Sequence, residues 1–146
     1  MLGAINMKAN ELWNKFSKEN NIESSYQAWS FGVDADNLAN LVLKGEKTGT
    51  SSAYDLYLQE NEPLPKEGDY SIILDSKNNA VCIIKTIKVE VIPFNEVTEM
   101  HAFKEGEGDK SLTYWRRVHE DFFKNLCINF NYNMKVVYEH FEVVYI

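Results

Sequence analysis

The chain has 146 residues, of which 45% are hydrophobic and 25% charged, and its formal net charge is −7. This length suits one domain with one sizeable core, and the composition is that of an ordinary globular protein. The acidic balance repels phosphate backbones at long range, which disfavours duplex DNA as a partner. Because the apolar stretches fall far short of the ~20 residues of a membrane helix and the N-terminus lacks a secretory signal pattern, we expect a cytoplasmic protein that does not enter a membrane.

The first third of the chain predicts two helices followed by a loop. Large apolar side chains recur at helical spacing over residues 9–20, which predicts a surface helix with one buried face. A second helix is predicted to begin after Asp34, a good N-cap, and to end at Gly45, which tolerates a left-handed C-terminal cap. Residues 45–52 are rich in glycine and small hydroxyl side chains. We expect them to form a loop whose backbone can approach a ligand closely.

The rest of the chain alternates between strand and helix patterns. In chain order we predict an aromatic segment at 54–58, a turn at 63–68, strands at 69–74 and 80–92 joined by a hairpin at 77–79, a helical turn at 94–101, a polar loop at 104–109, an amphipathic helix capped by Asp109 or Ser111, and a closing strand at 135–146. This mixture of elements indicates an α+β domain.

Cysteine and histidine give no pattern typical of a metal site. Cys82 and Cys127 have neither metal-ligand spacing nor a disulfide framework, and we interpret them as buried thiols. The three histidines, His101, His119 and His140, lack the close spacing of a zinc motif. We therefore predict no metal site and no cofactor.

Four motifs in order carry a family resemblance. They are Trp29-Ser30-Phe31-Gly32, the run Leu-Lys-Gly-Glu-Lys-Thr-Gly-Thr at 43–50, the run Glu-Gly-Glu-Gly-Asp-Lys-Ser-Leu at 105–112, and Trp-Arg-Arg-Val-His at 115–119, followed by an end strand around 136–145. Together they resemble the ASCH family, in particular its larger bacterial members. The resemblance covers about residues 26–146, so residues 1–25 are expected to be an N-terminal helical extension packed on an ASCH domain.

The resemblance implies a fold and a range of functions. ASCH domains are similar in fold to PUA domains, which implies a β-barrel or strongly curved mixed sheet flanked by helices, with a cleft between them. The family includes members with a proposed RNA-binding role, members that resemble N4-acetylcytidine hydrolases, and members described as ribonucleases. RNA or a modified nucleoside is therefore the expected partner, and oligomeric state is not predicted.

The resemblance to the acetylcytidine hydrolases also implies a catalytic set. The family's lysine, threonine and glutamate match Lys47, Thr50 and either Glu105 or Glu107, with Glu107 preferred because it lies centrally in its acidic, glycine-bearing stretch. In such a set a desolvated lysine takes a proton from the threonine hydroxyl, which attacks an amide carbonyl, and a carboxylic acid protonates the leaving amine.

Two other interpretations of the same residues stay open. In the first, Lys47 is a plain cation that binds a phosphate or a base carbonyl, while Glu107 accepts a hydrogen bond from an exocyclic amine and no bond is broken. In the second, the domain is regulatory and binds a protein partner. Simpler structural roles compete with all of these, because lysines in turns are usually just solvated and a threonine hydroxyl can merely close a turn.

Seven further residues are candidate ligand contacts because they belong to the same motifs. They are Trp29, Ser30, Phe31, Thr48, Glu105, Arg116 and Arg117. An aromatic side chain at Trp29 or Phe31 can stack on a base, although core packing is the commoner use of such residues. The two arginines can hold phosphate, although arginines on a helix face are usually only solvated. The prediction is a pocket between the Lys47 loop and the Glu107 loop, with hydrolysis as an open alternative.

Overall fold

A computed structural model describes residues 6–126 and 129–146 of the chain. The elements are α1 (Ala9–Asn20), β1 (Gln27–Trp29), α2 (Ala35–Leu43), β2 (Gly49–Ala53), α3 (Tyr54–Gln59), β3 (Tyr70–Leu74), β4 (Ala80–Pro93), the 3₁₀ helix η1 (Phe94–Glu96), α4 (Glu99–Glu105), α5 (Leu112–Asn125) and β5 (Lys135–Tyr145). In the part of the chain so described, no helix has the length and apolar character needed to span a membrane.

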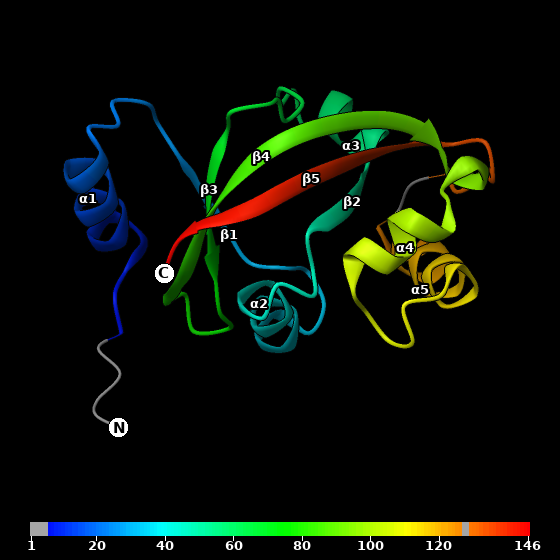
Figure 1. Ribbon diagram of the computed structural model, residues 1–146. Coiled ribbons are helices and arrows are strands. Elements are labelled where there is room, and N and C mark those ends of the chain that lie inside the picture. Colours follow the sequence, from blue (N-terminus) through cyan, green and yellow to red (C-terminus); the bar gives the residue numbers. More distant parts are fainter. Residues whose placement is uncertain (1–5, 127–128) are drawn as a thin grey trace.

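The five strands form one sheet in the order β1-β3-β4-β5-β2. Only the β1–β3 pair is parallel, and β4 and β5 form a long antiparallel ladder from Ile83↔Tyr145 to Pro93↔Lys135. Two register irregularities interrupt this ladder, and such bulges bend a strand and increase its twist. Figure 1 shows β4 and β5 arching across the molecule, so the predicted α+β fold with a strongly curved sheet is confirmed.

Helices cover the curved sheet at three places, each with its own apolar cluster. At one end, α1 packs Leu12, Trp13 and Phe16 against β3 and β4. At the middle, α2 contributes an apolar face that includes Val42 to a cluster with β3, β4 and Phe141 of β5. At the far end, α4 and α5 enclose a third cluster with η1 (Figure 1). The sheet thus separates α1 at one end from α4 and α5 at the other. A cleft lies along its concave side.

Several predicted elements are confirmed. The helix at 9–20 is α1, the helix after Asp34 is α2, and the strands at 69–74 and 80–92 are β3 and β4. Periodicity identified these elements because each buries one face on a local pattern. The thiol of Cys82 is buried as expected, whereas Cys127 lies outside the described residues.

The loop predicted at 45–52 is partly wrong, because its second half is strand β2. Each residue from Gly49 to Ala53 pairs with β5, between Gly49↔His140 and Ala53↔Val136. Glycine, serine and threonine give little strand signal of their own, but a long-range ladder satisfies their backbone groups and overrides weak local propensity. The correction matters because a strand fixes the direction in which each of its hydroxyl side chains points.

The predicted polar loop at 104–109 is shorter than expected, because α4 continues through Glu105. Thr98 caps the start of α4, and Gly106 ends it in the left-handed conformation with φ +72°. Of the two predicted caps for the next helix, Ser111 is the N-cap of α5, and its hydroxyl accepts a hydrogen bond from the backbone N–H of Tyr114. Glu105 is therefore held by a helix, and only Glu107 lies in the connecting loop.

Candidate functional site

A cleft of about 1060 Å³ opens on the concave side of the sheet. It lies between β2, the segment that follows β1, the turn before β3, and the facing side of α5. Sites for small ligands commonly have volumes of about 300–1,000 Å³, so this cleft has room for a nucleoside or a short strand. Its polar lining includes Lys47, Thr50, Ser51, Ser52, Tyr57, Glu105, Glu107, His119 and Glu139, and its aromatic lining includes Tyr26, Trp29, Phe31, Tyr70, Tyr114 and Phe122.

Lys47 is buried at one end of this cleft, with a side chain only 1% exposed. Its Nζ donates to the carbonyl oxygen of Gly49 at 3.0 Å, to Glu107 Oε2 at 2.8 Å and to Glu105 Oε1 at 3.3 Å. An ammonium group has three N–H donors and no acceptor. All three N–H donors of an ammonium at Lys47 therefore have partners inside the protein.

The loop that carries Lys47 is held against the end of α4 by backbone contacts. The N–H of Thr48 donates to the carbonyl of Lys104, at 2.7 Å. A side chain at Gly106 would collide with the carbonyl of Glu46. Glycine at this position has a specific role, since it both tolerates the left-handed φ and lets the two backbones meet. This close approach puts Lys47 within reach of Glu105, which precedes Gly106, and of Glu107, which follows it.

Glu105 is fully buried at the centre of the network. Its carboxylate accepts hydrogen bonds from Ser51 Oγ at 2.5 Å and from the indole N–H of Trp115 at 2.6 Å, in addition to the bond from Lys47. Burial by itself would raise the pKa of this carboxyl, but the charge of Lys47, the nearby His119 and the hydrogen bonds hold the pKa of Glu105 well below its usual range. The anionic form of Glu105 is therefore favoured, and its carboxylate organises its neighbours.

His119 on α5 completes this end of the cleft. Its ring stacks on Trp115 with 4.2 Å between centroids, its Nδ1–H donates to the Trp115 carbonyl at 2.9 Å, and its Nε2 lies 3.5 Å from Glu105. Burial opposes the charged form, but the Glu105 carboxylate outweighs it and raises the pKa of His119 above 6.5. His119 was not among the site residues predicted from the sequence. A histidine four residues after a tryptophan, on one helix face, was the available signal.

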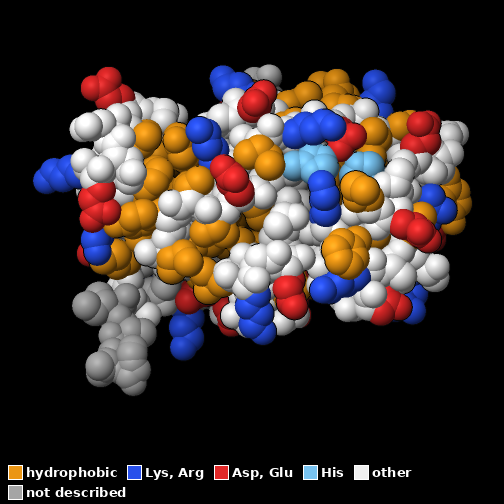
Figure 2. All heavy atoms as spheres, viewed as in Figure 1, with side chains coloured by type: hydrophobic (Ala, Val, Ile, Leu, Met, Phe, Trp, Pro, Cys, Tyr) orange, Lys and Arg blue, Asp and Glu red, His pale blue; other side chains and the backbone are white. Residues whose placement is uncertain are grey.

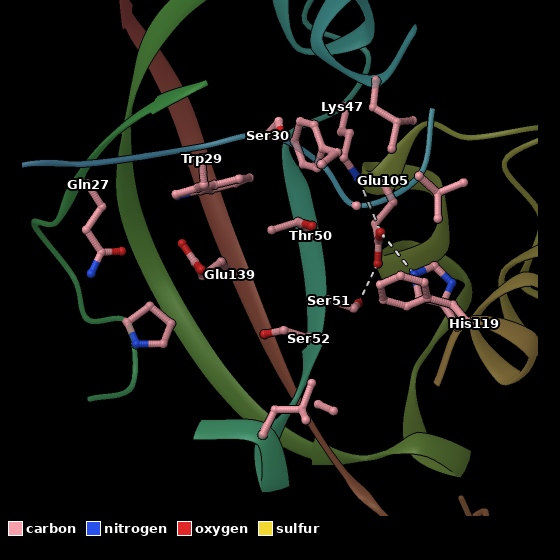
Figure 3. A pocket seen from close by; sticks show the side chains of 18 of the residues that line it. Gln27, Trp29, Ser30, Lys47, Thr50, Ser51, Ser52, Glu105, His119 and Glu139 are labelled. Carbon is pink, nitrogen blue, oxygen red and sulfur yellow. Dashed lines mark hydrogen bonds and ion pairs between the residues drawn. The ribbon is translucent and has the colours of Figure 1, made fainter. Parts of the chain in front are cut away.

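Strand geometry separates the hydroxyl groups of β2. Figure 3 shows Ser51 pointing toward Glu105 and His119, while Thr50 and Ser52 point to the other side of the strand, toward Glu139. Successive side chains of a strand alternate in this way. The structure thus places Lys47 and Glu107 in contact. The hydroxyl group that contacts their network belongs to Ser51 and not to Thr50, and Ser51 was not predicted from the sequence.

Thr50 faces a second polar wall built by β5. It is the register partner of Glu139, and partners in a ladder project to the same face of the sheet. Glu139 accepts a hydrogen bond from Thr86 Oγ1 at 3.0 Å, and beside it the hydroxyls of Ser52 and Tyr57 bond to each other at 2.7 Å. Burial raises the pKa of Glu139, which the Thr86 bond partly offsets and the charge of Asp69 reinforces. Glu139 therefore holds its proton to a higher pH than an exposed glutamate does.

The aromatic candidates divide between cleft and core. Trp29 and Phe31 meet edge to face with centroids 5.2 Å apart, and both line the cleft together with Ser30. Phe31 is buried and lies 5.2 Å from Lys47 Nζ, so its ring supports the cation as well as the core. Trp29 is only partly buried, and in Figure 3 its ring faces the space in front of Thr50 and Glu139.

Three of the predicted ligand contacts are not among the residues that line the cleft: Thr48, Arg116 and Arg117. Thr48 uses its backbone to join Lys104 and Phe141. The Arg116 guanidinium donates to the carbonyls of Asn95 and Val97. The guanidinium of Arg117 lies over the ring of Tyr114 at 5.4 Å. These contacts give all three residues a role in packing around the site.

Fold and cleft together define a small α+β domain that carries a buried ionic network at one end of a ligand-sized cleft. A family model described as the ASCH domain matches residues 27–145, so the chain belongs to the ASCH domain family, whose fold is PUA-like. The resemblance seen in the motifs is confirmed. No curated protein matches the sequence significantly.

Solved structures agree with this assignment. An ASCH domain from Lactobacillus crispatus JV V101 is 32% identical, with a TM-score of 0.87 and coverage of 94% of both chains. The protein EF3133 from Enterococcus faecalis V583 is 35% identical, with a TM-score of 0.84 over 93% of this chain and 87% of that one. The hypothetical protein PH0355 is 18% identical with a TM-score of 0.59 over 82% of this chain and 100% of that one, a likeness of fold alone.

Proposed function

We propose that the cleft binds a nucleobase, either in a free modified nucleoside or in single-stranded RNA. The observation that carries this proposal is the pairing of an aromatic wall at Trp29 with polar groups that are hydrogen-bond acceptors and neutral donors. Bases are recognised by stacking on aromatic side chains and by hydrogen bonds to their edges. A cleft of about 1060 Å³ accommodates a base together with its ribose.

The state of Lys47 argues against a phosphate as the main anchor. Its ammonium donates to two carboxylates and a carbonyl, so its charge is compensated before any ligand arrives. Phosphate binding depends on cations that release counterions, and the net charge of −7 adds a long-range repulsion. Recognition therefore falls to the base itself, with the backbone of any RNA left outside the cleft.

Glu107 and Glu139 have complementary roles in this proposal. The Glu107 side chain is 18% exposed and accepts one hydrogen bond from Lys47, which leaves acceptor capacity for an exocyclic amine of a base. Glu139 in its protonated form, which burial favours relative to an exposed glutamate, donates to an acceptor of the base. One acceptor and one donor suit a base edge that offers an amine or acylated amine together with a ring nitrogen or carbonyl acceptor, as cytosine does.

A titration of the purified chain tests this proposal. Cytidine, N4-acetylcytidine and a short single-stranded RNA are titrated by calorimetry into wild type, Trp29→Ala and Glu107→Gln, with circular dichroism confirming that each variant is folded. We expect saturable binding that weakens at least about tenfold in both variants, since loss of one stacking or hydrogen-bond contact costs about 1–3 kcal/mol. The matched control Glu142→Gln, an exposed carboxylate on β5, keeps wild-type affinity. Absence of binding to all three ligands, or equal affinity in all four proteins, sinks the proposal.

Hydrolysis of an N4-acylated cytidine is the second candidate, and the Thr50–Glu139 register pair favours it. In its ionised form, which burial makes a stronger base, the Glu139 carboxylate accepts a proton from the attacking water and returns it to the leaving amine, so that the carboxylic acid and cytidine are released. If Thr50 attacks instead, a water then hydrolyses the acyl-Thr50 ester and restores the hydroxyl. This assignment differs from the lysine-led set that the family resemblance implies, because the Lys47 donors are already used. Here Lys47 and Glu105 position the cleft, and Thr50 and Glu139 do the proton transfer.

Two variants separate the two catalytic assignments. With N4-acetylcytidine as substrate, Glu139→Gln is expected to abolish turnover while binding persists, because glutamine keeps the size of the side chain but can neither accept the proton nor return it. Turnover that survives in Glu139→Gln but not in folded Lys47→Met would contradict this assignment and restore the lysine as the base. Binding without turnover in wild type removes the hydrolase candidate and leaves the binding function standing.

A further inference from the structure

A second cluster of ionisable side chains lies away from the residues that line the cleft. It joins Glu90 of β4, His101 of α4 and His140 of β5. His140 Nε2 lies 2.5 Å from Glu90 Oε2, His101 Nε2 lies 3.1 Å from the same oxygen, and one ligand atom from each residue falls within 4.8 Å of the others. Figure 2 shows histidine side chains gathered at the surface over the region where β4 and β5 pass α4 in Figure 1.

The burial of the cluster is that of a sheltered but reachable site. The side chains of His101 and His140 are each 12% exposed, and that of Glu90 is 26% exposed. The two rings lie 6.1 Å apart and both contact the buried ring of Tyr138. The protein thus holds the three groups in place on one side and leaves the other side open to solvent.

The convergence of two imidazole nitrogens on one carboxylate oxygen is the key feature. If the cluster is held by hydrogen bonds alone, one oxygen of Glu90, Oε2, accepts from the Nε2–H groups of both histidines. The other oxygen of Glu90 contacts neither ring. Two imidazole nitrogens and a carboxylate oxygen within 4.8 Å of one another are also a typical ligand set for Zn²⁺. Nitrogen ligands with one carboxylate suit Zn²⁺ better than the oxygen-seeking Mg²⁺ or Ca²⁺.

We propose that Glu90, His101 and His140 bind one divalent transition-metal ion, with Zn²⁺ as the best fit and a water in the fourth position. The ion replaces the protons on the two Nε2 atoms. On His101 the proton moves to Nδ1, and Thr98 Oγ1, 2.9 Å away, accepts it in place of the hydrogen bond that the Thr98 backbone N–H gives to Nδ1 at 3.0 Å without the ion. A metal-bound histidine usually donates its other ring N–H to such a partner, which fixes the ring orientation.

An ion at this cluster would fasten α4 to the sheet. The three ligands come from α4, β4 and β5, and the Tyr138 hydroxyl already donates to the His101 carbonyl at 2.8 Å. The last residue of α4 is Glu105, the centre of the buried network. The metal would therefore stabilise the helix that positions the cleft, without touching a ligand in it.

Calorimetric titration of Zn²⁺ into the full, metal-stripped chain tests the site. We expect one Zn²⁺ per chain in wild type, and affinities at least about tenfold weaker in Glu90→Gln and His140→Phe. His140→Phe keeps an aromatic ring on Tyr138 and removes the ligand atom. Zn²⁺ should also raise the melting temperature of wild type and not of these two variants, because an ion that binds only the folded state stabilises it.

Two controls locate the site. Glu142→Gln removes an exposed carboxylate two residues along β5 from His140, and His119→Asn removes the third histidine of the chain. Both should bind Zn²⁺ as wild type does. No Zn²⁺ binding in wild type, unchanged affinity in folded Glu90→Gln and His140→Phe, or loss of binding in folded His119→Asn would each overturn the proposal. None of these outcomes bears on nucleoside binding, which is measured separately.

Discussion

The two polar walls of the cleft use the same residue types in opposite ways. At one wall, Glu105 is buried among Lys47, Ser51, Trp115 and His119, and every one of these neighbours contacts its carboxylate. At the other wall, Glu139 is partly buried, and only the hydrogen bond from Thr86 lowers its pKa. The first wall is complete without a ligand, and the second is ready to exchange hydrogen bonds with one.

The difference teaches how one small domain can shift the pKa values of two carboxyl groups in opposite directions. Cationic and hydrogen-bonding neighbours lower the pKa of Glu105, whereas burial raises the pKa of Glu139. Pairs of titratable groups whose environments push their pKa values apart are typical of sites that separate an anchoring role from proton exchange. We infer that Glu105 shapes the site and Glu139 meets the ligand.

Glu105→Ala gives the largest expected effect on this comparison. The substitution leaves the buried Lys47 and His119 without their common anion, and removing one partner of a buried ion pair typically costs about 3–5 kcal/mol of unfolding free energy. Urea denaturation measures this loss. Glu142→Ala, an exposed glutamate on β5, should stay within about 0.5 kcal/mol of wild type. Equal stabilities for both variants would mean that the buried network does not hold the fold.

Gly106→Ala is expected to have the next largest effect, because it separates the two segments of the network. Gly45→Ala is a matched control, since Gly45 has a similar φ of +75° but open space around it, whereas a side chain at Gly106 meets the backbone of Glu46. We expect about 1 kcal/mol of destabilisation at Gly45 from backbone strain, and about 1–3 kcal/mol more at Gly106 from the forced contact. Denaturant unfolding of the two variants decides this. Similar losses would show that the close approach at Gly106 contributes nothing.

Glu139→Gln is expected to have the smallest effect on stability. The pH dependence of this effect tests whether Glu139 differs from Glu105. Because burial raises the folded-state pKa of Glu139 above its ordinary value of 4.5, its contribution to stability is present below that pH and is lost as pH rises through the folded-state pKa. Glutamine mimics the protonated carboxyl at every pH. The variant should therefore gain stability relative to wild type as pH increases above 4.5.

The matching experiment follows the free energy of unfolding against pH for wild type, Glu139→Gln and Glu142→Gln. The difference between Glu139→Gln and wild type should grow with pH, while Glu142→Gln runs parallel to wild type. A flat difference for Glu139→Gln would show that this carboxyl is ionised in the native state like an exposed one, and would remove the contrast with Glu105.

Local patterns predicted much of the fold, because α1, α2, β3 and β4 each reveal themselves by periodicity or by a cap. They missed β2, whose small polar residues become a strand only through pairing with β5. The motif resemblance supplied what periodicity could not, namely the curved PUA-like sheet.

Prediction of the site residues shows the same difference between local and long-range information. Lys47 and Glu107 were identified from one loop each, and they meet at 2.8 Å. Ser51 and Glu139 were missed because strand alternation and cross-strand register decide where they point. The same holds for Glu90 and His140, which are 50 residues apart in the chain and meet only through the β4–β5 ladder. Spacing along the sequence carries no record of such contacts.

The most direct test of the central claim is a nuclear magnetic resonance titration of the labelled chain with N4-acetylcytidine. We predict that the largest amide shift changes fall on β2 around Thr50, on the segment at Trp29 and on β5 around Glu139, with smaller changes at Glu107. The centre of the buried network at Glu105 should move little, because its contacts are already complete. Shift changes confined to Arg116 and Arg117 on α5, or spread over residues outside the cleft, would contradict the account.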